Sequence, residues 1–255
     1  MSDTIAYVYA VVRGADERVV AGIAGVGGAR VRLVDAGDLQ AVVSDVDRAE
    51  FEAHALDEHL EDLTWLTLTA RAHHHVVDAV GRSEVVAPLS LATVYFDDDR
   101  VREVLDVHHD AFAGVLDRLR GRAEWGVKAW LRPGAPAGEP PAGPTAAKPR
   151  RGADYLRARR DALRSTEAAD DEVRAEADAL HRAVAELGDD DRRLRVQDAS
   201  LSGTSDRMVL NGAYLVPATS AVALTRLVDS FAEHPRLRVE LTGPWVPYSF
   251  AQAGT

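Results

Sequence analysis

The second half of the chain is organised around residues Met208–Val216, which read MVLNGAYLV. Its apolar and aromatic side chains are typical of a buried strand. On either side of this strand, the sequence predicts a strand at Glu124–Leu131, a helix at Asp154–Leu187 that Gly188 ends, a strand at Arg193–Gln197, a helix at Thr219–Glu233 and a strand at Leu237–Leu241. The order β-α-β-β-α-β predicts a ferredoxin-like domain with a long first helix.

The first half of the chain predicts a second mixture of strands and helices. Ile5–Val12 alternates aromatic and aliphatic residues, as strands do. The further predicted elements are a hairpin of Val31–Asp35 and Leu39–Ser44, a helix from Phe51 to about Val80 with at most one break, short extended pieces at Val85–Ala87 and Leu91–Tyr95, and a helix that begins at Asp97–Asp99 and ends near Arg120.

These elements predict the α+β class with two domains, at residues 1–121 and 122–255. Residues 132–151 read RPGAPAGEPPAGPTAAKPRR and hold six of the eleven prolines. Because proline lacks an N–H and glycine has high backbone entropy, this stretch cannot join a helix or a sheet. It is expected as a loop inserted after the first strand of the C-terminal domain.

Composition limits the class of protein. The chain has 255 residues, a net charge of −11 and no cysteine, which excludes disulfides, thiolate metal sites and a cysteine nucleophile. No apolar stretch approaches the length of a membrane helix, and the N-terminus lacks the features of a signal peptide. An acidic chain without a concentrated basic face does not suit nucleic acid. We therefore expect a cytoplasmic protein that binds neither nucleic acid nor membrane.

Three sequence features invite a chemical interpretation. The glycines of Gly22–Gly28 match neither the P-loop pattern, which ends in Gly-Lys-Ser/Thr, nor the dinucleotide-binding pattern G-x-G-x-x-G. They also precede a predicted strand, so we expect a flexible loop. The consecutive side chains of His73–His75 point about 100° apart on a helix and cannot share one metal ion; we expect one of His73 and His74 at the edge of the apolar face. The acids of Asp97–Asp99 and Asp189–Asp191 lie at helix ends, where solvated carboxylates are ordinary. We expect no catalytic residue, cofactor or metal.

Two features are compatible with binding a partner. The positions Val173, Ala177, Leu180, Val184 and Leu187 form a short coiled-coil-like seam, although the simpler interpretation is that the seam covers its own sheet. The stretch Thr242–Phe250 carries three aromatic residues, and its two prolines are expected to prevent regular structure. These aromatics either anchor a partner or fold back on their own domain, and folding back is the commoner outcome.

The chain resembles the GvpF/GvpL family of gas vesicle proteins in eight segments that follow in family order. The segments are Tyr7–Val12, Ala41–Val46, Leu63–His73, Pro88–Tyr95, Glu124–Trp130, Gly152–Arg160, Asn211–Pro217 and Thr242–Phe250. The chain departs from the family where Ser90–Thr93 replaces an Arg-Phe-Gly-Thr-like run, and where His74 replaces a common glutamate.

The resemblance implies an accessory or minor structural protein of the gas vesicle. It implies an N-terminal α+β domain, a ferredoxin-like C-terminal domain and contact with the small hydrophobic shell protein and other accessory proteins. It implies no catalytic residues. The candidate partner-binding residues are Trp245, Tyr248, Phe250, Arg159 and Arg160. Two alternatives stay open: an enzyme with a His and carboxylate cleft between the domains, and a regulatory module that binds a small ligand.

Overall fold

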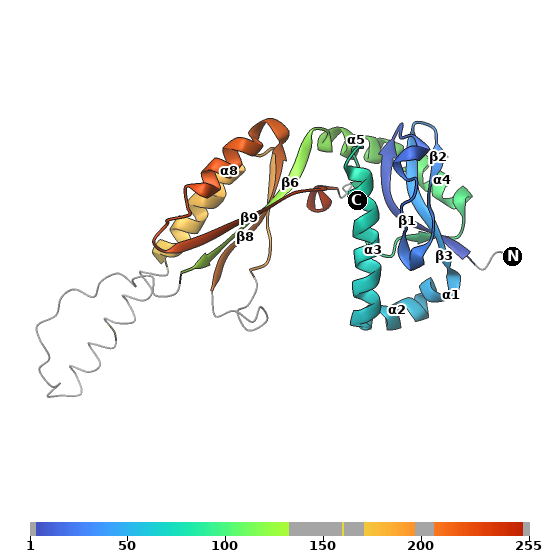
Figure 1. Ribbon diagram of the computed structural model, residues 1–255, viewed down its shortest axis with the longest axis horizontal. Helices are drawn as coiled ribbons and strands as arrows, with labels where there is room; N and C mark the ends of the chain where they lie inside the picture. Colours follow the sequence, from blue (N-terminus) through green and yellow to red (C-terminus); the bar gives the residue numbers. More distant parts are fainter. Residues whose placement is uncertain (1–3, 133–159, 161–170, 197–206, 252–255) are drawn as a thin grey trace, which may run out of the picture. The chain divides into compact units, whose positions relative to one another are not determined.

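The computed structural model describes residues 4–132, 160, 171–196 and 207–251. Contacts between Cα atoms divide the chain into two compact units, and Figure 1 shows the helices and strands of each. Unit 1 comprises Met1–Glu124 with Pro244–Thr255, and unit 2 comprises Trp125–Gly243. The α+β class is confirmed, because each unit combines helices with an antiparallel sheet.

The grouping of contacts differs from the expected domains at the C-terminus. From the sequence, residues 244–255 are expected in the second domain, whereas their contacts belong to unit 1. The division at residues 121 and 122 stays a prediction about which segments fold independently.

The sheet of unit 1 is built around one buried strand. Its strands are β1 (Thr4–Arg13), β2 (Val31–Ala36), β3 (Leu39–Asp47), β4 (Ala87–Pro88) and β5 (Val94–Tyr95). The order is β2-β3-β1-β4, and β5 also pairs with β1. The predicted hairpin of β2 and β3 is confirmed, with Ala36 opposite Leu39. Gly37 has a φ of 64°, which suits the tight turn between them.

The helices of unit 1 are shorter than predicted. They are α1 (Arg48–Phe51), α2 (Ala53–Glu61), α3 (Leu63–Gly81), α4 (Asp98–Val107) and α5 (His109–Leu119), with short 3-10 helices at Glu17–Val19, Val26–Gly28 and Tyr248–Phe250. The helix expected from Phe51 to about Val80 with at most one break is wrong in the number of breaks, since extended backbone at Glu52 and at Asp62 divides it twice. The carboxylate of Asp62 accepts from Thr64 N and Trp65 N, so N-capping explains this second break.

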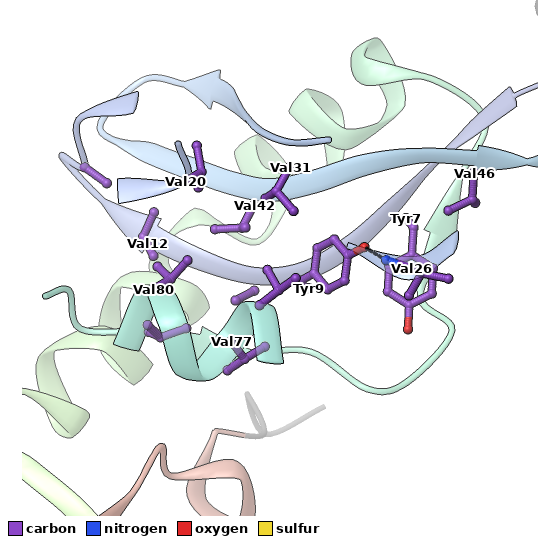
Figure 2. Close-up of a cluster of buried hydrophobic side chains, with 14 of the residues drawn as sticks. Tyr7, Tyr9, Val12, Val20, Val26, Val31, Val42, Val46, Val77 and Val80 are labelled. Atoms are coloured by element: carbon purple, nitrogen blue, oxygen red, sulfur yellow. Dashed lines mark hydrogen bonds between the residues drawn. The ribbon is translucent and has the colours of Figure 1, made fainter. Parts of the chain in front are cut away.

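Side chains from both faces of β1 are buried. On one face, Tyr7, Tyr9 and Val12 pack in a cluster with Val77 and Val80 of α3, as Figure 2 shows. A register shift between Val8 and Ala10 lets Val12 lie on the same face as Tyr7 and Tyr9. The residues of β1 that alternate with Tyr7 and Tyr9 are also buried, because α4 approaches β2 and β3 while α5 approaches β1. The apolar side chains buried on this second side include Ala6, Val8, Val101, Leu105, Val115 and Leu116.

The sheet of unit 2 has the strand order β7-β8-β6-β9. Its strands are β6 (Arg122–Leu131), β7 (Asp190–Arg193), β8 (Met208–Pro217) and β9 (Leu237–Trp245), and its helices are residues 171–185 and α8 (Ala221–Asp229), with a 3-10 helix at Ala218–Ser220. The chain passes from unit 1 to unit 2 within β6 and returns within β9.

The seam on the long helix lies inside unit 2. Ala177, Leu180 and Val184 belong to the same buried cluster as Val127 of β6 and Leu210 of β8. This confirms that the seam covers its own sheet. Of the helix predicted at Asp154–Leu187, residues 154–159 and 161–170 lie outside the described residues.

Two strand predictions in unit 2 are wrong at their ends. The strand expected at Arg193–Gln197 is β7, which ends at Arg193 and begins at Asp190. The strand expected to end at Leu241 is β9, which continues through Pro244 to Trp245. β9 is the edge strand of its sheet, so one of its sides has no neighbouring strand. A proline, which lacks an N–H, is tolerated on such a strand because no hydrogen bond between strands is lost on that side.

Candidate functional site: the C-terminal segment and the cleft beside α3

The C-terminal segment, residues 244–251, is held on unit 1 by charged side chains from two elements. Ser249 donates its backbone N–H to the Glu124 carboxylate at 2.8 Å and its hydroxyl to the other carboxylate oxygen at 2.6 Å. The guanidinium of Arg118 on α5 donates to the carbonyl oxygen of Phe250. Hydrogen bonds to charged groups contribute about 1.5–3 kcal/mol each, so these contacts fix the backbone of the segment.

Aromatic side chains of the segment complete this attachment. The ring of Tyr248 lies 5.7 Å from the ring of His74 and 6.3 Å from that of His73, both on α3. Burial raises the pKa of Tyr248, so its phenol stays neutral. Phe250 is fully buried. The segment therefore forms part of the interior of unit 1.

A glycine at the end of α3 lets the segment come close. A Cβ atom placed on Gly81 would lie 2.5 Å from Cγ2 of Val246, which is closer than carbon atoms approach. Val246 itself packs against the core cluster of unit 1. Any larger residue at position 81 therefore pushes the segment outward.

A cleft of about 510 Å³ lies beside this attachment. It is lined by the end of α3 and the residues after it (Asp78 and residues 81–86), by Leu119 and residues 121–123, and by residues 244–247. Its volume falls within the range of about 300–1,000 Å³ that is typical of binding sites. Trp245 lines the cleft and is 46% exposed, although its neighbours in the segment are fixed.

The charges that line the cleft balance one another. Asp78 and Glu84 are acidic, whereas Arg82 and Arg122 are basic. A cleft without a net charge does not select ions by sign. Between these charged groups, Val86, Leu119 and the indole of Trp245 offer contact to apolar or aromatic groups of a partner.

Comparison with known proteins assigns the chain to a family. Residues 5–252 match the family model described as "Gas vesicle synthesis protein GvpL/GvpF". The chain belongs to the GvpL/GvpF family. This GvpL/GvpF protein is 42% identical over 250 residues to gas vesicle protein L from a Streptomyces species, with 98% of this chain and 94% of the relative covered. It is 27% identical over 249 residues to gas vesicle protein F1 from Halobacterium salinarum, with 96% of this chain and 91% of the relative covered.

Solved structures support the same fold. The GvpF crystal structure from Anabaena has a TM-score of 0.68 with this chain at 15% identity, and covers 99% of this chain and 98% of its own. The GvpF crystal structure from Microcystis aeruginosa gives the same TM-score of 0.68 and 15% identity, with 97% and 99% covered. At this identity the similarity concerns the fold alone.

The structure separates the candidate residues of this GvpL/GvpF protein into groups. Tyr248 and Phe250 fold back on unit 1, whereas Trp245 stays exposed beside the cleft. Arg160 is helical and exposed, and Arg159 lies outside the described residues. Among the candidates that the structure describes, the three aromatic residues belong to the same unit, and the role of all the candidates in binding stays a prediction.

The histidine run is divided as the sequence analysis expected. His73 is 3% exposed, and its Nδ1 lies 3.0 Å from the hydroxyl of Tyr7. Because Ala92 N donates to that same hydroxyl, the hydroxyl hydrogen is available to His73. Burial lowers the pKa of His73 to about 4, so the ring is neutral near pH 7. Among the described residues, no three His, Asp or Glu side chains are placed to hold a metal ion.

Several residues of structural importance were missed from the sequence. Glu124, Arg118 and Gly81 hold the C-terminal segment, and only long-range contacts reveal this.

In unit 2, the hydroxyl of Tyr214 lies 2.7 Å from His181 Nδ1, and His181 Nε2 lies 3.3 Å from Asp191. Tyr214 is fully buried, so this chain of polar groups joins the helix to the interior of the sheet. In the part of the chain that the structure describes, no helix combines the length and apolar character needed to cross a membrane.

Proposed function

We propose that this protein is a non-enzymatic accessory or minor structural component of the gas vesicle that binds the small hydrophobic shell protein during assembly. Membership of the GvpL/GvpF family supports a role in gas vesicles. The observation that carries the binding proposal is Trp245, a half-exposed indole beside a cleft of mixed polarity and balanced charge, in an otherwise fixed segment. In this proposal the protein meets its partners in the cytoplasm and accompanies them to the vesicle.

Fixed aromatic side chains make effective anchors. A side chain that is ordered before binding loses less entropy when a partner covers it. Tryptophan is enriched among the residues that dominate binding energy, and such residues often cost 2 kcal/mol or more when truncated. The hydrogen bonds of Ser249 and Phe250 and the packing of Val246 hold the backbone on one side of Trp245 in place.

An apolar shell subunit needs protection before it polymerises. Large exposed apolar surfaces associate with one another in water. A partner that covers part of this surface and carries a net charge of −11 would keep the complex dispersed. In this proposal Trp245 supplies the apolar contact, and the net negative charge of the chain supplies the solubility.

The experiment is co-expression of the tagged full chain with the shell protein, followed by affinity capture. The variant Trp245→Ala is compared with Val222→Ala, which alters an apolar side chain that is 62% exposed on α8. We expect Trp245→Ala to reduce capture by about tenfold or more and Val222→Ala to leave it unchanged. Absence of capture by the unaltered chain, or equal capture by Trp245→Ala when circular dichroism shows it folded, would overturn the proposal.

Two finer statements belong to the same proposal. Unit 2 is proposed to have the ferredoxin-like arrangement, which its strand order β7-β8-β6-β9 supports. Arg159 and Arg160 are proposed to contact other accessory proteins, and the exposure of Arg160 supports this. Capture of those proteins by Arg160→Glu at the unaltered level would remove Arg160 from the proposal.

A further inference from the structure

A second surface of unit 1 presents an aromatic side chain to solvent. Phe96, between β5 and α4, is 71% exposed. Two hollows flank it, with volumes of about 380 Å³ and 670 Å³, and Ile5, Arg48 and Phe96 line both. Neither hollow shares a lining residue with the cleft beside Trp245.

The smaller hollow, here called the apolar hollow, suits a large apolar side chain. Ile5, Phe51 and Val94 line it together with Phe96. The guanidinium of Arg48 lies 5.3 Å from the centre of the Phe96 ring, which favours one orientation of the ring. Arg48 also forms an ion pair with Glu52 at 3.1 Å. A partner therefore meets an ordered aromatic wall.

The larger hollow, here called the acidic hollow, has an excess of negative charge. Its lining contains four aspartates (Asp45, Asp97, Asp98 and Asp99) and two arginines, Arg32 and Arg48. Arg32 binds both Asp45 and Asp98, at 2.5 Å and 2.8 Å. Even when Arg102, which binds Asp99 at 2.7 Å, is included, aspartates outnumber arginines by four to three. The acidic hollow thus favours a cationic group.

We propose that Phe96 and the two hollows form a docking groove for an extended, basic and apolar peptide segment of a partner protein. One large aliphatic or aromatic side chain occupies the apolar hollow, and a neighbouring lysine or arginine occupies the acidic hollow. Among the described strands β5 pairs with β1 alone, so an extended segment can run beside its other edge. Complementary charge selects this occupant over an acidic peptide.

The test uses synthetic peptides and the full-length protein, without the shell protein, so it is independent of the proposal for Trp245. The probe is a short fluorescent peptide that alternates valine or leucine with lysine. Its counterparts carry glutamate in place of lysine or serine in place of the aliphatic residues. Fluorescence anisotropy should show the lysine peptide binding at least about tenfold more tightly than either counterpart.

Matched variants locate the binding on the protein. Phe96→Ser should weaken binding of the lysine peptide by about tenfold or more, whereas Val107→Ser on α4, at the same 71% exposure, should have no effect. Asp99→Lys changes a side chain that is 93% exposed and should reverse the preference between the lysine and glutamate peptides. Equal binding of the two peptides, equal effects of Phe96→Ser and Val107→Ser, or an unchanged preference in Asp99→Lys would overturn the proposal.

Discussion

Phe250→Ala should destabilise unit 1 although the residue lies near the C-terminal end of the chain. Phe250 is fully buried, and its carbonyl oxygen accepts from Arg118 on α5. Truncation to alanine keeps this backbone hydrogen bond and removes only the ring. The variant therefore isolates how much the packing of one C-terminal side chain contributes to the unit.

The expected loss follows from the size of the cavity. Replacing a buried phenylalanine by alanine typically costs about 3–5 kcal/mol. A domain has about 5–15 kcal/mol of total stability, so the loss is a large share. Since about 1.4 kcal/mol corresponds to a tenfold change, the open state of unit 1 should become at least about a hundredfold more populated.

Hydrogen exchange followed by mass spectrometry measures this effect in each unit separately. Amides of β1 and α3 should exchange at least about a hundredfold faster in Phe250→Ala, provided that they exchange through opening of unit 1. The matched control is Phe231→Ala, since Phe231 packs against the core cluster of unit 2. That variant should accelerate exchange in β8 and the helix at residues 171–185.

Hydrogen exchange in the Phe250→Ala variant can also contradict a structural role of the C-terminal segment. If Phe250→Ala leaves exchange in β1 and α3 unchanged, or accelerates it only in β8, the segment contributes nothing to the interior of unit 1. The same outcome would remove the argument that a fixed backbone presents Trp245.

Three further predictions concern the same region. Since burial lowers the pKa of His73 to about 4 from the ordinary 6.5, the unfolded chain binds the proton first as the pH falls. Urea unfolding should therefore show full stability above about pH 6.5 and a loss of about 3 kcal/mol by pH 4, and His73→Gln should remove that part of the pH dependence. Gly81→Ala should lose about 1–3 kcal/mol in urea unfolding, and Val246→Ala in the same chain should restore much of the loss, because it removes the clashing methyl groups. Glu124→Gln should lower the stability of unit 1 by about 1–2 kcal/mol, because Ser249 loses a charged acceptor, and should accelerate hydrogen exchange in the C-terminal segment. Unchanged hydrogen exchange in Glu124→Gln would contradict this prediction. Stability losses of Gly81→Ala and Val246→Ala that simply add in the double variant would contradict the prediction for Gly81.

Local patterns predicted the type of most elements of the fold. The hairpin of β2 and β3 follows from two apolar runs around a short turn that contains Gly37. The burial of His73 follows from its spacing among the apolar residues of α3, because positions three and four apart share a helix face. The element boundaries failed where a capping side chain such as Asp62 competed with continuation of a helix.

The candidate site could be predicted only in part. The sequence pointed to the aromatic residues of the C-terminal segment, but not to the groups that hold it. Glu124 and Ser249 are 125 residues apart, and a contact over such a distance leaves no local pattern. The extension of β9 through Pro244 was missed for a related reason, since only the sheet order reveals that β9 is an edge strand.

Unit 1 contains residues from both halves of the chain, and this links the folding of the unit to its proposed function. Residues 244–251 supply Phe250 and Val246 to the unit, and α3 supplies Gly81 and the rings that contact Tyr248. The attachment that fixes Trp245 is therefore complete only after the C-terminal segment has been made and has folded back. A chain without this segment loses the indole and also exposes the apolar side chains that the segment covers. It follows that the surface proposed to bind the shell protein forms in the same step that closes the core of unit 1.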